Sequence, residues 1–123
     1  MPHCIFEYSG NVLDEPDWVE TMSALHTALM RTGEFELADI KSRVVRHELF
    51  VVGDGAADRT FVTLDVQMLS GRSDETKAAI AQAALEVLAG AFPRTLAETR
   101  ASLTVQITDI HRPSYRRRRS ASS

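Results

Sequence analysis

The residue with the most distinctive chemistry in this sequence is Pro2, which directly follows Met1. A small residue behind an initiator methionine normally allows that methionine to be removed, which would leave the proline as a free secondary amine. A proline inside a chain is an amide without a basic nitrogen, whereas an N-terminal proline accepts a proton. The reference pKa of an α-amino group is about 7.7–8.0, and burial or nearby cations lower it toward neutrality. Pro2 is therefore a candidate general base, although Met-Pro is also a common start for a chain with no such role.

No other spaced catalytic signature accompanies Pro2. The sequence has no glycine-rich phosphate loop, no nucleophile elbow and no pair of cysteines or histidines at metal-ligand spacing. Because His47 and His111 have no partner at such a spacing, we expect no metal site. His26 falls on the apolar side of a predicted helix and Cys4 within a predicted strand, positions that favour a structural role for both.

The elements that must position Pro2 form two matching halves. In the first half, residues 3–9 predict a strand, because they are rich in apolar and aromatic side chains and are followed by the turn signal Gly10-Asn11. A helix of about 16 residues follows and ends at Gly33. Its predicted buried side carries Trp18, Met22, Leu25, Leu29 and Met30. Residues 41–52 then predict a second strand, whose apolar side carries Val45, Leu49 and Val51.

The second half repeats this order. Residues 61–69 and 102–110 alternate as strands, and Ser73 between them is a good N-cap for a helix that ends before Pro93. Right-handed crossovers place both helices on one face of a single sheet. The sequence thus predicts an α+β fold, in which two β-α-β units form a four-stranded mixed sheet with two helices on one face.

Charge divides the chain into two parts. The length of 123 residues allows one compact domain, and 44% hydrophobic and 25% charged residues are typical of a folded protein. Residues 112–123 hold five arginines, so residues 1–111 carry 9 basic and 17 acidic residues, a net charge of −8. We predict a folded domain over residues 1–111 and a basic, disordered tail over residues 112–123 that the activity of the domain does not need. The acidic domain argues against nucleic acid as the main partner.

The cysteine content and hydropathy indicate where the protein resides. Cys4 is the single cysteine and cannot form an internal disulfide, which fits a reducing compartment. No apolar run approaches the roughly 18 residues of a membrane span, and no segment has the pattern of a signal peptide. We therefore expect a cytoplasmic protein without a membrane partner.

Three short motifs carry a resemblance to a known family. They are Pro2-His3 followed by Glu7-Tyr8-Ser9 and Asn11, the segment Ala38-Asp39-Ile40-Lys41-Ser42-Arg43-Val44, and Gly71-Arg72-Ser73 followed by Glu75. In order and spacing these motifs resemble the 5-carboxymethyl-2-hydroxymuconate isomerase family, a branch of the tautomerase superfamily. The resemblance covers the chain from Pro2 to about Ile110.

The resemblance implies a tautomerase-like homotrimer without metal or organic cofactor. It implies an isomerase that moves a proton within an unsaturated 2-oxo (dienol) dicarboxylate, above all 5-carboxymethyl-2-hydroxymuconate in the catabolism of aromatic compounds. Pro2 would be the base, and Lys41 and Arg72 match the family's substrate-binding cations. The family's usual residue at position 41 is arginine, so lysine is a departure that supplies a point charge instead of a planar fork. Arg43 shares a strand side with Lys41 and is a further candidate for a substrate carboxylate.

Other interpretations of the same residues stay open. Lys41 and Arg43 also suit the solvated edge of a strand, and Arg72 also suits an ion pair with nearby Asp74 or Glu75. The lysine at position 41 motivates a tautomerase of a smaller 2-oxo acid, such as an arylpyruvate. The run Arg116 to Arg119 motivates a non-catalytic trimeric binding protein whose tail recruits a polyanion.

Overall fold

A single four-stranded sheet organises the chain, whose computed structural model describes residues 1–121. Its strands are β1 (His3–Ser9), β2 (Lys41–His47), β3 (Arg59–Leu69) and β4 (Arg100–Ile110). They lie in the order β2-β1-β3-β4. β1 pairs in parallel with β2, and β3 with β4, while the central pair of β1 and β3 is antiparallel. The predicted four-stranded mixed sheet is confirmed.

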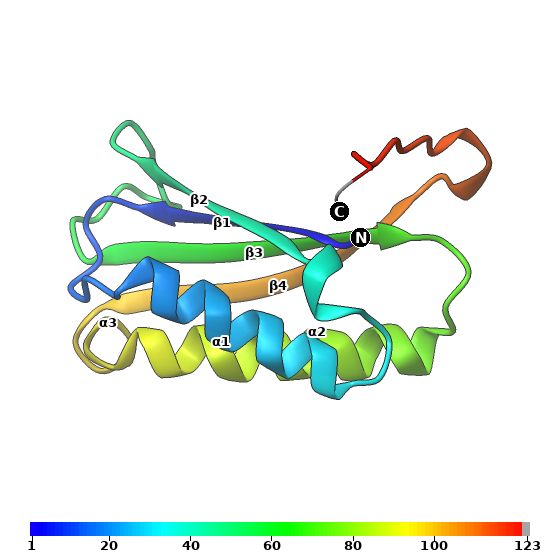
Figure 1. Cartoon of the computed structure of the whole chain (residues 1–123). Coiled ribbons are helices and arrows are strands. Elements are labelled where there is room, and N and C mark those ends of the chain that lie inside the picture. Colours follow the sequence, from blue (N-terminus) through cyan, green and yellow to red (C-terminus); the bar gives the residue numbers. More distant parts are fainter. Residues whose placement is uncertain (122–123) are drawn as a thin grey trace.

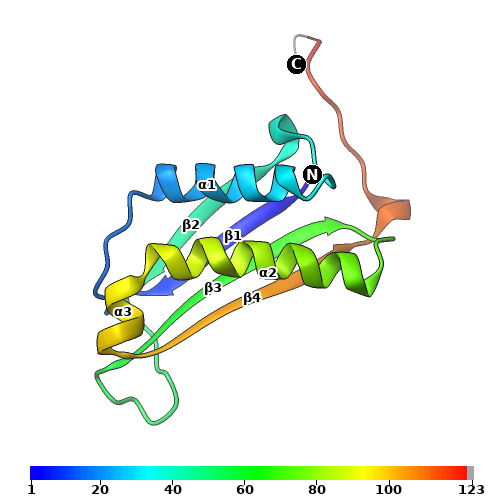
Figure 2. The ribbon, with the colours of Figure 1, turned by 90° about the horizontal axis from the view of Figure 1, so that it is seen from below.

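Helices α1 (Trp18–Arg31) and α2 (Asp74–Ala91) cover one face of this sheet, as Figures 1 and 2 show. The Asp17 carboxylate begins α1 by accepting a hydrogen bond from the Glu20 N–H at 3.1 Å. Ser73 begins α2 in the same way, through the Thr76 N–H at 3.2 Å. The predicted pair of helices on one face is confirmed. In the part of the chain that the structure describes, no helix combines the length and the apolar character needed to span a membrane.

The hydrophobic core lies between the sheet and these helices. Each strand directs alternate side chains toward the helices. Of the predicted buried side of α1, Trp18, Met22, Leu25 and Leu29 pack in or against the core, whereas Met30 is 39% exposed. Trp18 closes one end of the core, with its ring centroid 5.3 Å from that of Phe6 and 5.8 Å from that of Phe92. The largest fully buried apolar side chains are Phe6, Phe92, Leu25, Leu29, Leu64, Met68, Ile80 and Leu88.

The short helix α3 (Pro93–Glu98) was not predicted. Pro93 was interpreted only as the end of α2, but proline also suits the first turn of a helix, where its missing N–H has no partner to lose. Pro93 therefore ends one helix and begins the next. Two single turns of 3-10 helix complete the chain, η1 (Leu37–Asp39) and η2 (Arg112–Ser114).

β2 is shorter than the predicted strand 41–52, because it ends at His47. Its one neighbour, β1, ends at Ser9, and the His47 carbonyl accepts the last hydrogen bond from the Gly10 N–H at 2.8 Å. Beyond that point no strand is left to pair with, and Leu49 and Val51 are 97% and 79% exposed. The predicted apolar side was also wrong, since Val44 packs against the core while Val45 is 44% exposed.

Residues 112–121 differ from the predicted disordered tail. They begin with η2 and then turn back toward the start of the chain, as the red end of the ribbon in Figure 1 shows. Arg117 and Arg119 both form ion pairs with Asp39. The arginines that suggested a solvated tail therefore form ion pairs with a carboxylate of the domain. Residues 122 and 123 of the predicted tail lie outside the described residues.

The two β-α-β units begin their strand pairs with equivalent hydrogen bonds. In the first unit the Lys41 N–H donates to the Pro2 carbonyl at 3.1 Å, and in the second the Arg100 N–H donates to the Asp58 carbonyl at 2.9 Å. Since β1 and β3 are antiparallel, these two hydrogen bonds lie at opposite ends of the sheet. Pro2 and Asp58 thus occupy equivalent places in the two units.

A buried polar contact joins α3 to the segment before α1. The Asp14 carboxylate accepts hydrogen bonds from the N–H groups of Arg94 and Thr95 at 3.2 and 2.7 Å. It also accepts one from the Thr95 hydroxyl at 2.6 Å. Thr95 is fully buried and in turn accepts from the backbone N–H groups of Leu13 and Asp14. Asp14 therefore caps α3 from a distant part of the chain.

We expect Asp14→Ala to lower the free energy of unfolding by about 1–2 kcal/mol, because the first turn of α3 loses its cap. Denaturant unfolding followed by circular dichroism measures this change. The control is Glu98→Ala, which removes only the exposed ion pair with Arg94 and should have little effect. Equal effects of the two substitutions would contradict the capping role of Asp14.

Candidate active site

Pro2 lies buried at the start of β1, directly beside the start of β2. The parallel register pairs His3 with Lys41 and Ile5 with Arg43. In this chain Met1 still precedes Pro2, and its amine donates a hydrogen bond to the Asp39 carbonyl at 3.0 Å. The end of the chain is therefore held between η1 and the first residue of β2.

The N-terminal amine is set in surroundings that disfavour its charged form. Burial lowers the pKa of the Met1 amine below its usual 8.0, and the cations of Lys41, Arg117 and Arg119 lower it further against the opposing effect of Asp39. Pro2 is one residue deeper and is itself buried. The same two causes, desolvation and neighbouring cations, therefore surround the Pro2 nitrogen.

Asp39 is the acidic centre of this region. Burial raises the pKa of its carboxyl, but the surrounding positive charges outweigh that effect and leave the pKa below its usual value. These charges belong to the N-terminal amine, Arg119, Arg117 and Lys41. Its backbone carbonyl accepts hydrogen bonds from the Met1 amine and, at 3.2 Å, from the Lys41 ammonium. Asp39 was not among the predicted site residues, although it lies within the second family motif.

A pocket of about 490 Å³ opens at this place. Its lining consists of Ala38, Asp39, Lys41, Arg117, Arg118, Arg119 and Ser120. Lys41, one of the predicted substrate-binding residues, therefore faces a cavity next to the chain start. The arginines of the tail were visible in the sequence, but nothing in their spacing indicated that they would fold back to Asp39.

Arg43 lies next to this region and holds His3. Its guanidinium is 3.2 Å from His3 Nδ1, and because arginine only donates, that nitrogen accepts the hydrogen bond. Burial, with the positive charges of Arg43, Lys41 and the N-terminal amine, lowers the pKa of His3. His3 is therefore kept neutral as a partner of Arg43, in line with a structural role.

Arg72 is engaged in a different place from Lys41, and its partner is neither Asp74 nor Glu75. Its Nε donates to a Glu34 carboxylate oxygen at 2.9 Å, and its Nη atoms donate to the carbonyls of Glu34 and Leu69. The guanidinium also lies over the Phe35 ring, 4.7 Å from the centroid. Arg72 thus ties the segment after α1 to the turn before α2, and it does not line the pocket beside Lys41.

Cys4 and His26 belong to the interior. Burial raises the pKa of the Cys4 thiol to about 11, which keeps it protonated and unreactive near neutral pH. His26 Nε2 lies 2.7 Å from the Ser42 hydroxyl on the helix-covered side of β2. Both residues have the structural setting that the sequence predicted.

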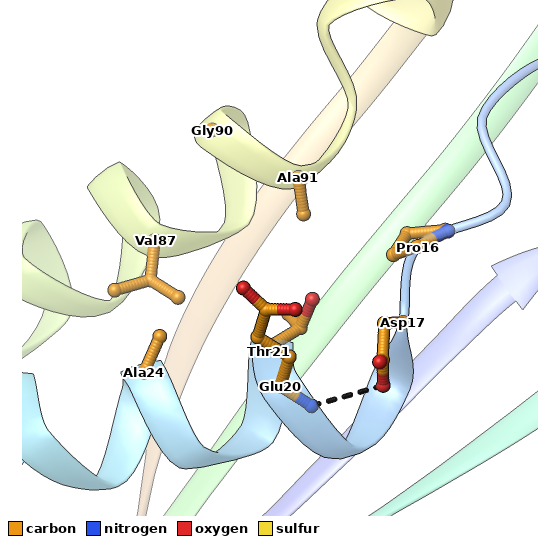
Figure 3. A pocket seen from close by; sticks show the side chains of 8 residues that line it. All are labelled: Pro16, Asp17, Glu20, Thr21, Ala24, Val87, Gly90 and Ala91. Atoms are coloured by element: carbon orange, nitrogen blue, oxygen red, sulfur yellow. Dashed lines mark hydrogen bonds between the residues drawn. The ribbon is translucent and has the colours of Figure 1, made fainter.

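A second depression lies between α1 and α2, beside the start of α1 and the end of α2 (Figure 3). This groove of about 330 Å³ is lined mainly by small residues such as Ala24, Gly90 and Ala91. Its charged groups are Asp17, which caps α1, and Glu20. Two carboxylates repel an anionic ligand, so the groove does not suit an acidic substrate.

Comparison with known proteins identifies the family. The family model described as 5-carboxymethyl-2-hydroxymuconate isomerase matches residues 2–121. The chain is 29% identical over 111 residues to the 5-carboxymethyl-2-hydroxymuconate Delta-isomerase of Escherichia coli, covering 90% of this chain and 88% of that protein.

Solved structures agree with this match. The crystal structure of a 5-carboxymethyl-2-hydroxymuconate isomerase from Deinococcus radiodurans R1 has a TM-score of 0.87 and 27% identity, covering 97% of this chain and 90% of that one. A fused 4-OT protein, described as a symmetric trimer, shares the fold with a TM-score of 0.71 at 17% identity, over 89% of this chain and 85% of that one. Family and fold together support an isomerase or tautomerase activity. The chain belongs to the 5-carboxymethyl-2-hydroxymuconate isomerase family of the tautomerase superfamily.

Proposed function

We propose that this protein isomerises 5-carboxymethyl-2-hydroxymuconate in the cytoplasm, as a step in the catabolism of aromatic compounds, with the amine of Pro2 as general base. The observation that carries the proposal is the buried position of Pro2 beside Lys41, in a chain of this family. Removal of Met1 would expose the Pro2 nitrogen at the place where the Met1 amine now meets Asp39. The reaction would need neither metal nor organic cofactor.

The proposed chemistry requires a Pro2 nitrogen that is neutral near physiological pH. The Pro2 nitrogen takes the proton of the substrate's 2-hydroxyl group, and the electrons of that O–H bond form the C2 carbonyl. The C2=C3 double bond moves to C3=C4, and the electrons of C4=C5 take a proton at C5 from the proline ammonium. The base is thereby regenerated, and no atom is gained or lost. Lys41 stabilises the negative oxygen or an adjacent carboxylate during the transfer.

Lys41 and Arg43 are the proposed binding residues in β2. Lys41 lines the pocket, and Arg43 follows on the same side of the strand. Arg72 needs to leave Glu34 before it can bind a substrate carboxylate, so we propose that its contribution is to hold the segment after α1 in place. Of the three predicted cations, Lys41 is thus the best placed to contact the substrate directly.

We also propose a homotrimer. Over residues 1–121, no second layer of this chain covers the face of the sheet that points away from the helices. Leu49 and Val51, which follow β2 in the chain, are exposed. A second and third copy would cover these groups and the β2 edge. The binding-protein alternative is less favoured, because Arg117 and Arg119 of the tail meet Asp39 beside the proposed site.

Blocking the Pro2 nitrogen should abolish catalysis. We expect a form that retains Met1 to isomerise the substrate about 10²–10⁴-fold more slowly than the processed protein, because it lacks the general base. Mass spectrometry establishes the N-terminus of each form, and ultraviolet absorbance follows the loss of the dienol. Circular dichroism serves as the control for folding. Equal rates with and without Met1 would refute the mechanism.

The pH profile should reflect the lowered pKa of the chain's amine. Because the neutral amine is the active form, kcat/KM should fall as the pH decreases through the pKa of the free protein. Burial and nearby cations lower the pKa of the Met1 amine below its usual 8.0, and we expect them to act in the same direction on the Pro2 amine once Met1 is removed. A midpoint at or above 8.0 in the processed protein would contradict this account.

Substitutions of Arg72 and Lys41 should have separate effects. We expect Arg72→Gln to lower the free energy of unfolding by about 2 kcal/mol, since it loses charged hydrogen bonds to Glu34. Lys41→Met should leave stability nearly unchanged but raise KM about tenfold, because a charged contact with the substrate is lost. Denaturant unfolding and steady-state kinetics measure the two quantities. A stable Arg72→Gln protein with a raised KM would instead assign Arg72 to the substrate.

A further inference from the structure

The C-terminal run Arg117–Arg119, hereafter the arginine segment, lies against the proposed site. Arg117 Nη1 is 3.4 Å from Oδ1 of Asp39, and Arg119 forms an ion pair with the same oxygen. Arg118 lies between them and also lines the pocket. The carbonyl of Asp39 holds the Met1 amine, so the arginine segment and the chain start meet at one residue.

The pocket is strongly positive within an acidic domain. Its described lining has four cationic side chains, those of Lys41 and the arginine segment, and one carboxylate, that of Asp39. Residues 1–111 carry a net charge of −8. A local excess of positive charge in an acidic protein attracts an anionic ligand to that one place.

The proposed substrate has more carboxylates than the two proposed binding cations of β2 can match. 5-Carboxymethyl-2-hydroxymuconate carries three carboxylates, two at the ends of the muconate chain and one on the branch, which is one more than a plain dicarboxylate. In the described residues Arg72 is occupied by Glu34 and Arg43 holds His3. Lys41 and Arg43, the two proposed binding residues of β2, match at most two of the three carboxylates.

The guanidinium groups of the arginine segment have N–H donors that their ion pairs with Asp39 do not use. Arginine has five N–H donors, and over residues 1–121 Arg117 and Arg119 each direct one nitrogen to Asp39. The Arg119 side chain is 51% exposed, and an ion pair at such a site is weak and readily exchanged. A substrate carboxylate can therefore join Asp39 or replace it.

We propose that the arginine segment binds a substrate carboxylate at the mouth of the Pro2 site and thereby selects substrates with several carboxylates. This inference rests on the proposed function. With Pro2 as the base, the reacting carbons of the substrate lie beside Pro2 and its remaining carboxylates extend toward the pocket. Asp39 acts as an internal competitor that holds the arginines in place when no substrate is bound. The tail is thus part of the binding site, in contrast to the dispensable segment expected from the sequence.

The test compares Arg119→Gln with Arg116→Gln in the full-length, processed protein. Arg116 is a matched control because it carries the same charge but donates to the carbonyls of Pro113 and Tyr115, outside the pocket. The substrates form a series with three, two and one carboxylates: 5-carboxymethyl-2-hydroxymuconate, 2-hydroxymuconate and phenylenolpyruvate. Sedimentation velocity verifies that the variants keep the oligomeric state of the unaltered protein.

We expect Arg119→Gln to raise KM for the tricarboxylate by about tenfold or more with little change in kcat, as the loss of a charged hydrogen bond predicts. KM for the monocarboxylate should change less than about threefold, and Arg116→Gln should match the unaltered protein on all three substrates. Equal changes on all three substrates, or equal effects of the two variants, would overturn the proposal.

A second measurement separates this proposal from the proposed function. Calorimetric titration with propane-1,2,3-tricarboxylate measures binding without turnover. Arg119→Gln should weaken this binding, and Asp39→Asn should strengthen it several-fold, because the internal competitor is removed. Those two opposite shifts would support the arginine segment even in a protein that isomerises none of the substrates. Active protein whose affinity for the probe responds to neither substitution would overturn it.

Discussion

The parallel pairing of β1 with β2 is the constraint on which the proposed site depends. It ties the first residues of the chain to the start of β2 through the hydrogen bond between the Lys41 N–H and the Pro2 carbonyl. Without this register, the first residues of the chain would be frayed in water, and an amine there would be protonated near neutral pH. A strand that is paired from its first residue gives a terminal amine the burial that a general base requires.

The surrounding charges follow from the same pairing. The segment that leads into β2 brings Asp39 and Lys41 to the start of the chain, and Asp39 in turn holds Arg117 and Arg119. Asp39 thus binds cations from the two ends of the sequence, the Met1 amine through its carbonyl and the two arginines through its carboxylate. In this way a cationic pocket forms on a domain that has more acidic than basic residues.

Much of this architecture could be predicted, because alternation and helix caps are local signals. Ser73 marked the start of α2, and the apolar alternation of β3 marked its buried side. The end of β2 depended on where its neighbour β1 stops, which the sequence of β2 alone does not contain. The partner of Arg72 and the contacts of Arg119 are long-range ion pairs, and residue spacing carries no information about them.

The internal duplication has a final consequence for stoichiometry. Asp58 stands in the second unit where Pro2 stands in the first, but its nitrogen is an amide in mid-chain and has no basicity. Its carboxylate pairs with Arg100, the counterpart of Lys41, at 2.6 Å, so the cation at that end is already neutralised. A polypeptide has only one N-terminus, so the proposed mechanism gives a fold of two equivalent halves a single catalytic centre for each chain.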